Sequence, residues 1–272
     1  MSLKAKIRNY AKKNGIAAQV VLQNYMFERF LVRLSRSEYR DKFVIKGGVL
    51  IAAIVGLDTR STMDLDTTLR GLPFVDEKIR TVLEAIGNVG VDDGVEFRVM
   101  SIEPIRKDDR YGGYRIRVNA VYDTVSTPLS IDVSTGDVIT PGAIQYEFSG
   151  LFNEAEHISL WGYNIETVLA EKVETVLRRG IFNTRLKDYY DIYVLAATQK
   201  YNRKVFKEAF TATAAYRRSL ENVANRDAIV RQIADDNGLR EMWVKYQSQF
   251  AYAKGIPYSD IIAALQSLLN LL

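Results

Sequence analysis

Cysteine is absent from the 272-residue chain, and histidine occurs once, at His157. The lack of cysteine excludes disulfides, iron–sulfur clusters, thiolate zinc sites and cysteine nucleophiles. A single histidine excludes a histidine-rich metal site, and a Ser-His-Asp triad would depend wholly on that one residue. We therefore expect any catalysis to use carboxylates, lysine, arginine or tyrosine.

Long apolar runs are also missing from the sequence. No stretch approaches the roughly 18 apolar residues that suggest a membrane span. The first residues, MSLKAKIRNYAKKNG, are basic and lack the apolar centre of a secretory signal. We therefore expect a cytoplasmic protein with no membrane partner.

The net charge of +4 is small, but the charges are unevenly distributed. Residues 1–46 carry 11 basic and 3 acidic side chains, residues 47–163 carry 10 and 18, and residues 164–272 carry 16 and 12. An acidic middle between basic flanks suits a metal-binding core with anion-binding walls. Ordinary variation of surface charge would give the same pattern, so it supports a polyanionic partner only weakly.

Hydrophobic periodicity predicts helices at both ends of the chain. Residues 3–36 keep helical spacing and form an N-terminal arm. From about residue 160 the pattern is helical to the end, with breaks at Gly180, Gly238 and Gly255. The predicted helices cover 164–180, 184–199, 203–219, 225–237, 239–254 and 258–271.

The sequence pattern in the middle of the chain predicts a mixed sheet. FVIK, MDLDTTL, VEFRVMSIEPI, YRIRVNAVY and PLSIDVSTGD are predicted strands, the last with Pro128 at its start. RKDDRYGG suits the connection of an antiparallel hairpin, and VLIAAIVG and FVDEKIRTVLEAIGN suit helices. We predict an α+β fold with a sheet domain over residues 1–155 and a helical domain over 156–272.

The first candidate site is Lys46-Gly47-Gly48 followed by Arg60-Ser61-Thr62-Met63-Asp64-Leu65-Asp66. Two glycines between a strand and a helix let backbone amides approach a phosphate at the helix N-terminus. Asp64 and Asp66 leave the same face of their strand, while Leu65 points into the core. Two adjacent carboxylates repel each other unless a cation lies between them, which favours a hard divalent ion.

A third carboxylate, Asp132, follows in LSIDVSTGD. Ile131 and Val133 should face one side of this strand and Asp132 the other. If the strand lies beside that of Asp64 and Asp66, three carboxylates converge as a two-metal phosphoryl-transfer site requires. Asp137 is predicted to be a turn residue.

The helical part offers Lys172 in AEKVETVLRR and Asp188 and Asp191 in RLKDYYDIYVL. The two aspartates share a helix face at i,i+3, where like charges destabilise. One interpretation is a functional acid pair. The alternative is an internally neutralised helix, with Arg185 offsetting Asp188 and Lys187 offsetting Asp191, and Lys172 on a solvated surface.

Taken in order, the segments KGG, RSTMDLD, IDVSTGD, AEKVETVLRR and RLKDYYDIYVL resemble the AbiEii/AbiGii family of nucleotidyltransferase toxins, over about residues 40–200. The resemblance implies a DNA-polymerase-β-like nucleotidyltransferase sheet followed by a helical bundle. It implies a toxin of a toxin–antitoxin pair, acting in abortive infection of phage-infected cells and opposed by a winged-helix antitoxin. Relatives transfer a nucleotide from an NTP, some to tRNA 3′ ends, and others are described as GTP-binding.

By this resemblance the amides of Gly47 and Gly48 bind the triphosphate, and Asp64 and Asp66 ligate Mg²⁺, with two ions during turnover. Asp132 occupies the place of the superfamily's third catalytic and metal-binding carboxylate. The resemblance further assigns phosphate binding and catalysis to Lys172, catalysis to Asp191, and nucleotide positioning to Asp188 beside it. From the glycine segment we also predict nucleotide binding by Lys46, Arg60 and Ser61.

The chain departs from the family pattern in two respects. Fifteen residues separate Gly48 from Asp64, where about ten are usual, and Val49 stands where relatives have a hydroxyl residue. The predicted function is nonetheless Mg²⁺-dependent transfer of NMP from an NTP, such as GTP or CTP, to an RNA acceptor. Alternatives are a small-molecule or protein hydroxyl as acceptor, or a nucleotide-binding regulator without turnover. Cations including Arg178, Arg179, Arg185, Arg217, Arg218 and the N-terminal arm could guide RNA.

Overall fold

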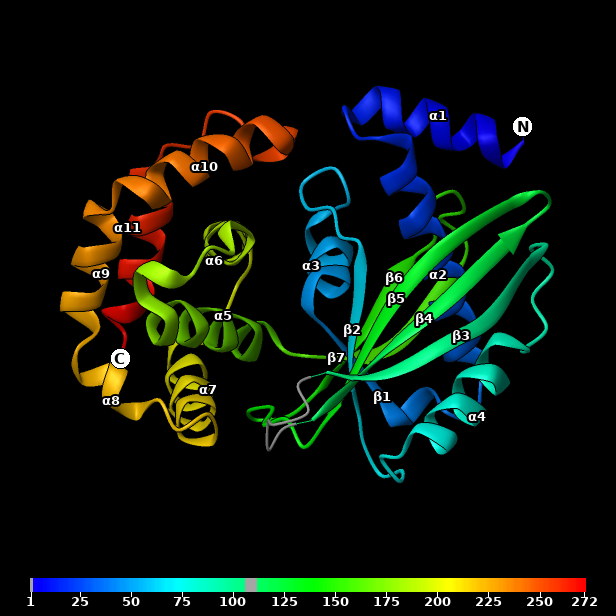
Figure 1. Cartoon of the computed structure of the whole chain (residues 1–272), viewed down its shortest axis with the longest axis horizontal. Coiled ribbons are helices and arrows are strands. Elements are labelled where there is room, and N and C mark those ends of the chain that lie inside the picture. Colours follow the sequence, from blue (N-terminus) through cyan, green and yellow to red (C-terminus); the bar gives the residue numbers. More distant parts are fainter. Residues whose placement is uncertain (1, 106–111) are drawn as a thin grey trace. The chain divides into compact units, whose positions relative to one another are not determined.

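The computed structural model describes residues 2–105 and 112–272, and the chain forms two compact units (Figure 1). The first unit comprises residues 1–137 and 143–163, and the second comprises residues 138–142 and 164–272. The sequence placed a domain boundary between residues 155 and 156. A strand of the first unit, β7 (His157–Gly162), follows that point directly.

The first unit is built on a seven-stranded mixed sheet with the order β3-β4-β5-β2-β1-β7-β6 (Figure 1). Two pairs, β2 with β5 and β1 with β7, are parallel, and the other neighbours are antiparallel. The strands are β1 (Phe43–Lys46), β2 (Asp64–Leu69), β3 (Val95–Ile105), β4 (Gly113–Tyr122), β5 (Val125–Thr135), β6 (Ile144–Ser149) and β7. The α+β fold class predicted from the sequence is confirmed.

The two faces of the central strands differ in chemistry because side chains alternate along a strand. Leu65 and Ile131, on β2 and β5, are buried at 1% and 0% exposure. Helices pack against this apolar face, and Phe30 of α2 meets Phe97 of β3 edge-to-face at 5.5 Å between ring centroids. The opposite face carries the polar residues of the predicted site.

Four helices accompany the sheet, namely α1 (Leu3–Asn14), α2 (Ala18–Arg36), α3 (Gly47–Val55) and α4 (Asp76–Gly87). The helical arm predicted over residues 3–36 is confirmed as the two helices α1 and α2, which Gly15 separates. Gly15 has φ of +64°, the left-handed conformation that ends a helix at low cost when the residue is glycine. The helices expected after the KGG motif and after Pro73 are confirmed as α3 and α4.

Three details of the strands differ from the prediction. β5 begins at Val125, so Pro128 lies inside the strand and not at its start. This proline is tolerated because pairing with β2 begins only at Ser130, which leaves β4 as the one partner strand at Pro128. Strands β6 and β7 were not predicted. The hairpin of β3 and β4 is confirmed, and its predicted connection at 106–111 lies outside the described residues.

The second unit is helical, as predicted. It contains α5 (Ile165–Arg179), α6 (Leu186–Thr198), α7 (Arg203–Tyr216), α8 (Leu220–Ala224), α9 (Arg226–Asp235), α10 (Asn237–Gln249) and α11 (Tyr258–Leu269). The helix break predicted at Gly238 lies two residues earlier, at Asp236, whose side chain caps α10 by accepting from the Leu239 amide at 2.7 Å. In the part of the chain that the structure describes, no helix has the length and apolarity to cross a membrane.

Candidate active site

The two predicted carboxylates lie on one face of β2. Asp64 and Asp66 are both half-buried, while Leu65 between them is 1% exposed and packs in the core. The alternation of a strand therefore presents both acids on the polar face of the sheet, as the sequence predicted.

The Lys46-Gly47-Gly48 segment brings the N-terminus of α3 against this pair. Gly47 has φ of +64°, and a Cβ atom added there would lie 2.1 Å from Oδ2 of Asp66. Lys46 occupies the N-cap position but makes no side-chain capping bond. The opening of α3 therefore combines backbone amides with an adjacent carboxylate, the arrangement that suits phosphate together with a cation.

Gly48 is required for a second close approach. A Cβ atom there would lie 2.4 Å from Oγ1 of Thr62 and 3.5 Å from Nη2 of Arg60. Arg60 is 3% exposed and donates a hydrogen bond to the carbonyl of Ser61. Since Val49 offers no hydroxyl, the hydroxyl beside the glycines is that of Thr62. Arg60 therefore lies at the glycine turn, and its hydrogen bond with Ser61 is to the backbone carbonyl of that residue.

Asp132 lies beside Asp66, because β5 runs parallel to β2 with these two residues in register. Its carboxylate is held by Arg115 of β4, with Nε to Oδ1 at 2.9 Å and Nη2 to Oδ2 at 2.7 Å. These bonds and the charge of Asp132, with smaller contributions from Asp64 and Asp66, raise the pKa of Arg115. Within residues 2–105 and 112–272, no group of three or more His, Cys, Asp or Glu side chains is placed to hold a metal ion.

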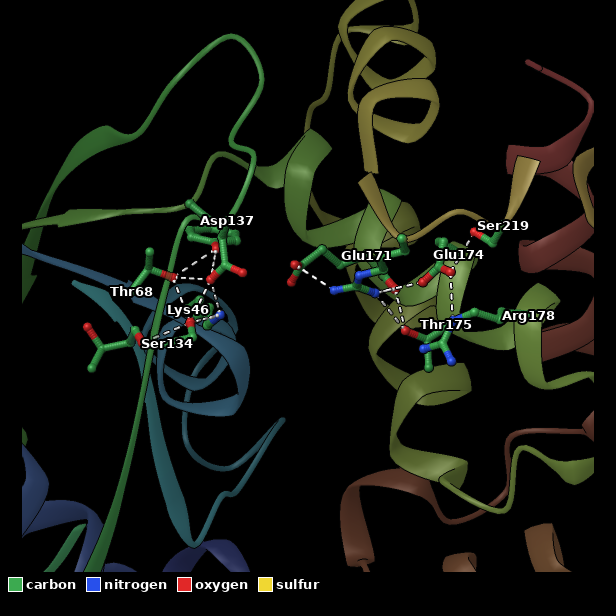
Figure 2. A network of polar contacts seen from close by, with 12 residues as sticks. Lys46, Thr68, Ser134, Asp137, Glu171, Glu174, Thr175, Arg178 and Ser219 are labelled. Atoms are coloured by element: carbon green, nitrogen blue, oxygen red, sulfur yellow. Dashed lines mark hydrogen bonds and ion pairs between the residues drawn. The ribbon is translucent and has the colours of Figure 1, made fainter. Parts of the chain in front are cut away.

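Asp137 is the centre of a polar network that the sequence did not predict (Figure 2). One oxygen, Oδ2, accepts from Lys46 Nζ at 2.5 Å, Thr68 Oγ1 at 2.5 Å, Ser134 Oγ at 2.6 Å and Tyr163 Oη at 3.0 Å. Burial alone would raise the pKa of Asp137, but the Lys46 charge and the donated hydrogen bonds lower it to about 2. The prediction of an ordinary turn residue was therefore wrong.

No local signal identified this role. Asp137 follows the end of β5, and apart from its near neighbour Ser134 its partners come from β1, β2 and the residue after β7. Lys46, predicted to bind nucleotide, is held by this network and also donates to Ser134 at 2.7 Å. The network fixes the end of β1 from which α3 begins.

In the second unit, Lys172 of α5 joins the two predicted aspartates of α6. Its Nζ lies 2.6 Å from Oδ1 of Asp188 and 2.9 Å from Oδ2 of Asp191. The two carboxylates are almost fully buried, with side-chain exposures of 3% and 0%. The surface interpretation of Lys172 is therefore wrong, because its charge offsets a buried acid pair. The expected Arg185–Asp188 pair is present at 3.5 Å.

Comparison with known proteins assigns the fold and the family. A profile of the family described as Nucleotidyl transferase AbiEii toxin, Type IV TA system matches residues 29–265. The chain belongs to this family.

One solved structure supports the fold, and a second is reported beside it. A crystal structure from H. pylori, described as a candidate nucleotidyltransferase, superposes with a TM-score of 0.53 and 14% identity over 94% of this chain and 96% of that one. JHP933 from Helicobacter pylori gives a TM-score of 0.49 and 14% identity over 93% of each chain. No curated protein matches the sequence.

As an AbiEii-family member, the chain is a nucleotidyltransferase of a toxin–antitoxin system. The family implies a nucleotide substrate and an antitoxin partner. The similarity to the first H. pylori structure, at 14% identity, supports the fold alone. The roles of individual residues therefore depend on the geometry described above.

Two of the arginines predicted to guide RNA, Arg178 and Arg217, pair with acids of α5. Arg217 lies 2.8 Å from Glu171 and 2.7 Å from Glu174, and Glu174 also accepts from Arg178 at 2.9 Å and Ser219 at 2.8 Å (Figure 2). Glu174 is 1% exposed. These arginines therefore offset buried charge between the α7–α8 connection and α5.

The N-terminal helix α1 has free cations instead. Lys4, Arg8 and Lys12, spaced at i, i+4 and i+8, are all exposed and form no ion pair with any described residue. We call these three residues the α1 basic stripe. Because they have the spacing of one helix face and lack acidic partners, they are available for contacts with phosphates.

Proposed function

We propose that this nucleotidyltransferase transfers NMP from an NTP, GTP or CTP, to an RNA acceptor such as a tRNA 3′ end, and that it acts in phage defence. The observation that carries the proposal is the contact of Asp66 with Gly47, which places the β2 carboxylates directly against the amide end of α3. A winged-helix antitoxin would oppose its activity.

The donor set of β2 fits Mg²⁺. Mg²⁺ binds through one or two carboxylates plus substrate phosphates and water, and Asp64 and Asp66 offer two half-buried carboxylates on one strand face. Asp64 and Asp66 would hold the metal, which when bound would offset the charge that develops on the attacking and leaving oxygens. Asp132 would contribute as a third acid only when released from Arg115.

The remaining residues would bind and orient the substrates. The amides of Gly47 and Gly48 and the Arg60 guanidinium would hold the triphosphate, while Asp137 keeps Lys46 in place at the start of α3. The acceptor hydroxyl would attack the α-phosphorus, the bond to the β-phosphate oxygen would break, and pyrophosphate would leave. The hydroxyl proton would pass to a carboxylate or to water.

The second unit holds a charged cluster of its own, Lys172 with Asp188 and Asp191. The two aspartates hold the Lys172 ammonium from two sides at 2.6 and 2.9 Å, which fixes a long, flexible side chain. Because two carboxylates outnumber the one ammonium, Lys172 would bind a phosphate as a point charge only by exchanging one of these contacts for it.

The α1 basic stripe supports RNA as the acceptor, since exposed cations without acidic partners bind phosphates and release counterions. Ser61 would lie near the phosphates of the nucleotide, because it stands between Arg60 and Thr62 at the glycine turn.

The deciding experiment is a transfer assay. The full chain would be incubated with Mg²⁺, each α-³²P-NTP in turn and total bacterial RNA, beside Asp64→Ala and the control Glu154→Ala, an exposed acid of the β6–β7 connection. Label in a tRNA-sized band with wild type and the control, but not with Asp64→Ala, is expected. Transfer retained by Asp64→Ala would refute the metal assignment.

Other results would redirect the proposal. Label on protein or small molecules without RNA would identify a different acceptor. Binding of NTP without transfer to any acceptor, together with a cellular effect that survives Asp64→Ala, would indicate a nucleotide-binding regulator.

A further inference from the structure

Three charged residues form a row across adjacent strands of the first unit. Asp132 of β5 is in register with Asp66 of β2 on one side and with Arg115 of β4 on the other. Residues paired in register on neighbouring strands project from the same face of a sheet. Arg115, Asp132 and Asp66 therefore share the polar face that also carries Asp64.

The Asp132 carboxylate is fully engaged by its neighbour. Both of its oxygens accept from the Arg115 guanidinium, at 2.9 and 2.7 Å, in the bidentate geometry that gives the strongest carboxylate pairs. The Asp132 side chain is 18% exposed, whereas that of Arg115 is 43% exposed, so the pair lies at the surface of the polar face with its carboxylate end the less exposed. A divalent cation on the same oxygens would lie against the guanidinium charge.

We propose that Arg115 withholds Asp132 from the metal site, so that the nucleotide-free chain binds one divalent cation through Asp64 and Asp66 alone. This inference rests on the proposed function, since it concerns the same carboxylates. Arg115 is a positioning residue, because it acts through Asp132.

Charge balance supports this assignment. With Arg115 neutralising Asp132, two carboxylates remain, and one divalent cation offsets them. Without Arg115, three adjacent carboxylates would face one another, a set that attracts divalent cations more strongly.

The test measures Mn²⁺ binding to the full chain without nucleotide, by calorimetry and by electron paramagnetic resonance. The variants are Arg115→Gln and the control Arg117→Gln. Arg117 lies two residues further along β4 and is exposed, and its in-register neighbour on β5 is Ser130, not an acid. It therefore matches Arg115 in charge and strand face while lacking the carboxylate.

We expect wild type and Arg117→Gln to bind one Mn²⁺ per chain with equal affinity. Arg115→Gln should bind Mn²⁺ at least about tenfold more tightly, or bind a second ion, because Asp132 is released as a further carboxylate. Arg117 stands in the same row position relative to Asp64 as Arg115 does to Asp66, so Arg117→Gln controls for the loss of a positive charge alone. The double variant Arg115→Gln/Asp132→Asn should return to wild-type binding, an outcome that a general loosening of the sheet would not produce.

Several outcomes would overturn the inference. Unchanged Mn²⁺ binding in a folded Arg115→Gln variant would show that Arg115 does not control the site. A loss of binding in Asp132→Asn as large as in Asp64→Asn would show that Asp132 is already a ligand. Either result leaves the transfer activity standing, whereas absence of Mn²⁺ binding in all variants would also refute the proposed metal site.

Discussion

The Asp137 network makes a quantitative prediction about stability. Asp137→Asn removes the negative charge while keeping the shape of the side chain and an oxygen that accepts hydrogen bonds. The pKa of Asp137 falls from an ordinary 3.8 to about 2 in the folded chain. At about 1.4 kcal/mol per pKa unit, we expect the first unit to lose about 2 kcal/mol of unfolding free energy at pH 7.

The dependence on pH follows from the direction of the shift. Because the folded-state pKa of Asp137 is depressed, its contribution is complete above the unfolded-state pKa and is lost as the pH falls toward the folded-state value. The difference between wild type and Asp137→Asn should therefore be constant from about pH 8 to pH 5. It should shrink from about pH 4 downward.

The measurement is urea unfolding followed by tryptophan fluorescence. The chain has two tryptophans, Trp161 on β7 of the first unit and Trp243 on α10 of the second. A Trp243→Phe background therefore makes Trp161 a reporter of the first unit. Glu154→Gln in the same background controls for loss of an exposed acid.

Two results would refute this reasoning. A change below about 0.5 kcal/mol at pH 7 would mean that the four donors do not favour the charged carboxylate. A loss that persists unchanged at pH 3 would mean that the effect is steric. A double-mutant cycle with Lys46→Met would measure the share of the ion pair, since Lys46 is the charged partner.

Three further predictions concern other parts of the chain. Gly47→Ala should destabilise the first unit by at least about 1–3 kcal/mol and abolish transfer, because its Cβ would lie 2.1 Å from Asp66 and φ is positive. The control Gly90→Ala, which has open space around it, should unfold at the wild-type temperature. A Gly47→Ala variant with wild-type unfolding temperature and activity would refute the clash. Lys172→Met should lower the unfolding free energy of the second unit by about 3–5 kcal/mol, measured by urea unfolding, because two buried carboxylates lose their shared cation. A decrease of less than about 1 kcal/mol would contradict this role of Lys172. Replacing the α1 basic stripe with glutamine should lower the slope of log K for RNA against log salt by about two, and an unchanged slope in a filter-binding assay would exclude this helix as a phosphate contact.

The polar face of β2 was predictable because it depends on local periodicity. Alternation along MDLDTTL placed Asp64 and Asp66 together opposite Leu65, and the structure confirms this. The two glycines before an apolar run likewise predicted the start of α3. These features involve residues close in sequence, so the strand and helix periods suffice.

Partners from distant segments were not predictable in the same way. The sequence could say only that Asp132 would converge with Asp64 and Asp66 if its strand lay beside theirs. The adjacency is confirmed, but β4 on the other side brings Arg115 onto the same carboxylate. Strand order decides both contacts, and no spacing in the sequence encodes it.

Among the charged residues of the helical unit, contacts within one helix were likewise predictable and contacts between helices were not. The i,i+3 spacing identified Asp188 and Asp191 as a like-charge pair and Arg185 as one counterion. The cation that bridges the pair, Lys172, comes from another helix. The resemblance assigned Lys172 to phosphate, the alternative placed it on a solvated surface, and neither predicted its bonds to the two aspartates. Burial of a charged side chain depends on helix packing, which amphipathic pattern alone does not resolve for residues at the edge of the apolar face.

By itself, the sequence determined the fold class, the family and the two β2 carboxylates next to the glycine turn, because motifs and short periods are properties of contiguous residues. Only the tertiary structure decided which charge each acid faces: Lys46 for Asp137, Arg115 for Asp132, and Lys172 for Asp188 and Asp191. The physical reason is that ion pairs act over a few ångströms in space, while the paired residues stand 16 to 91 positions apart along the chain.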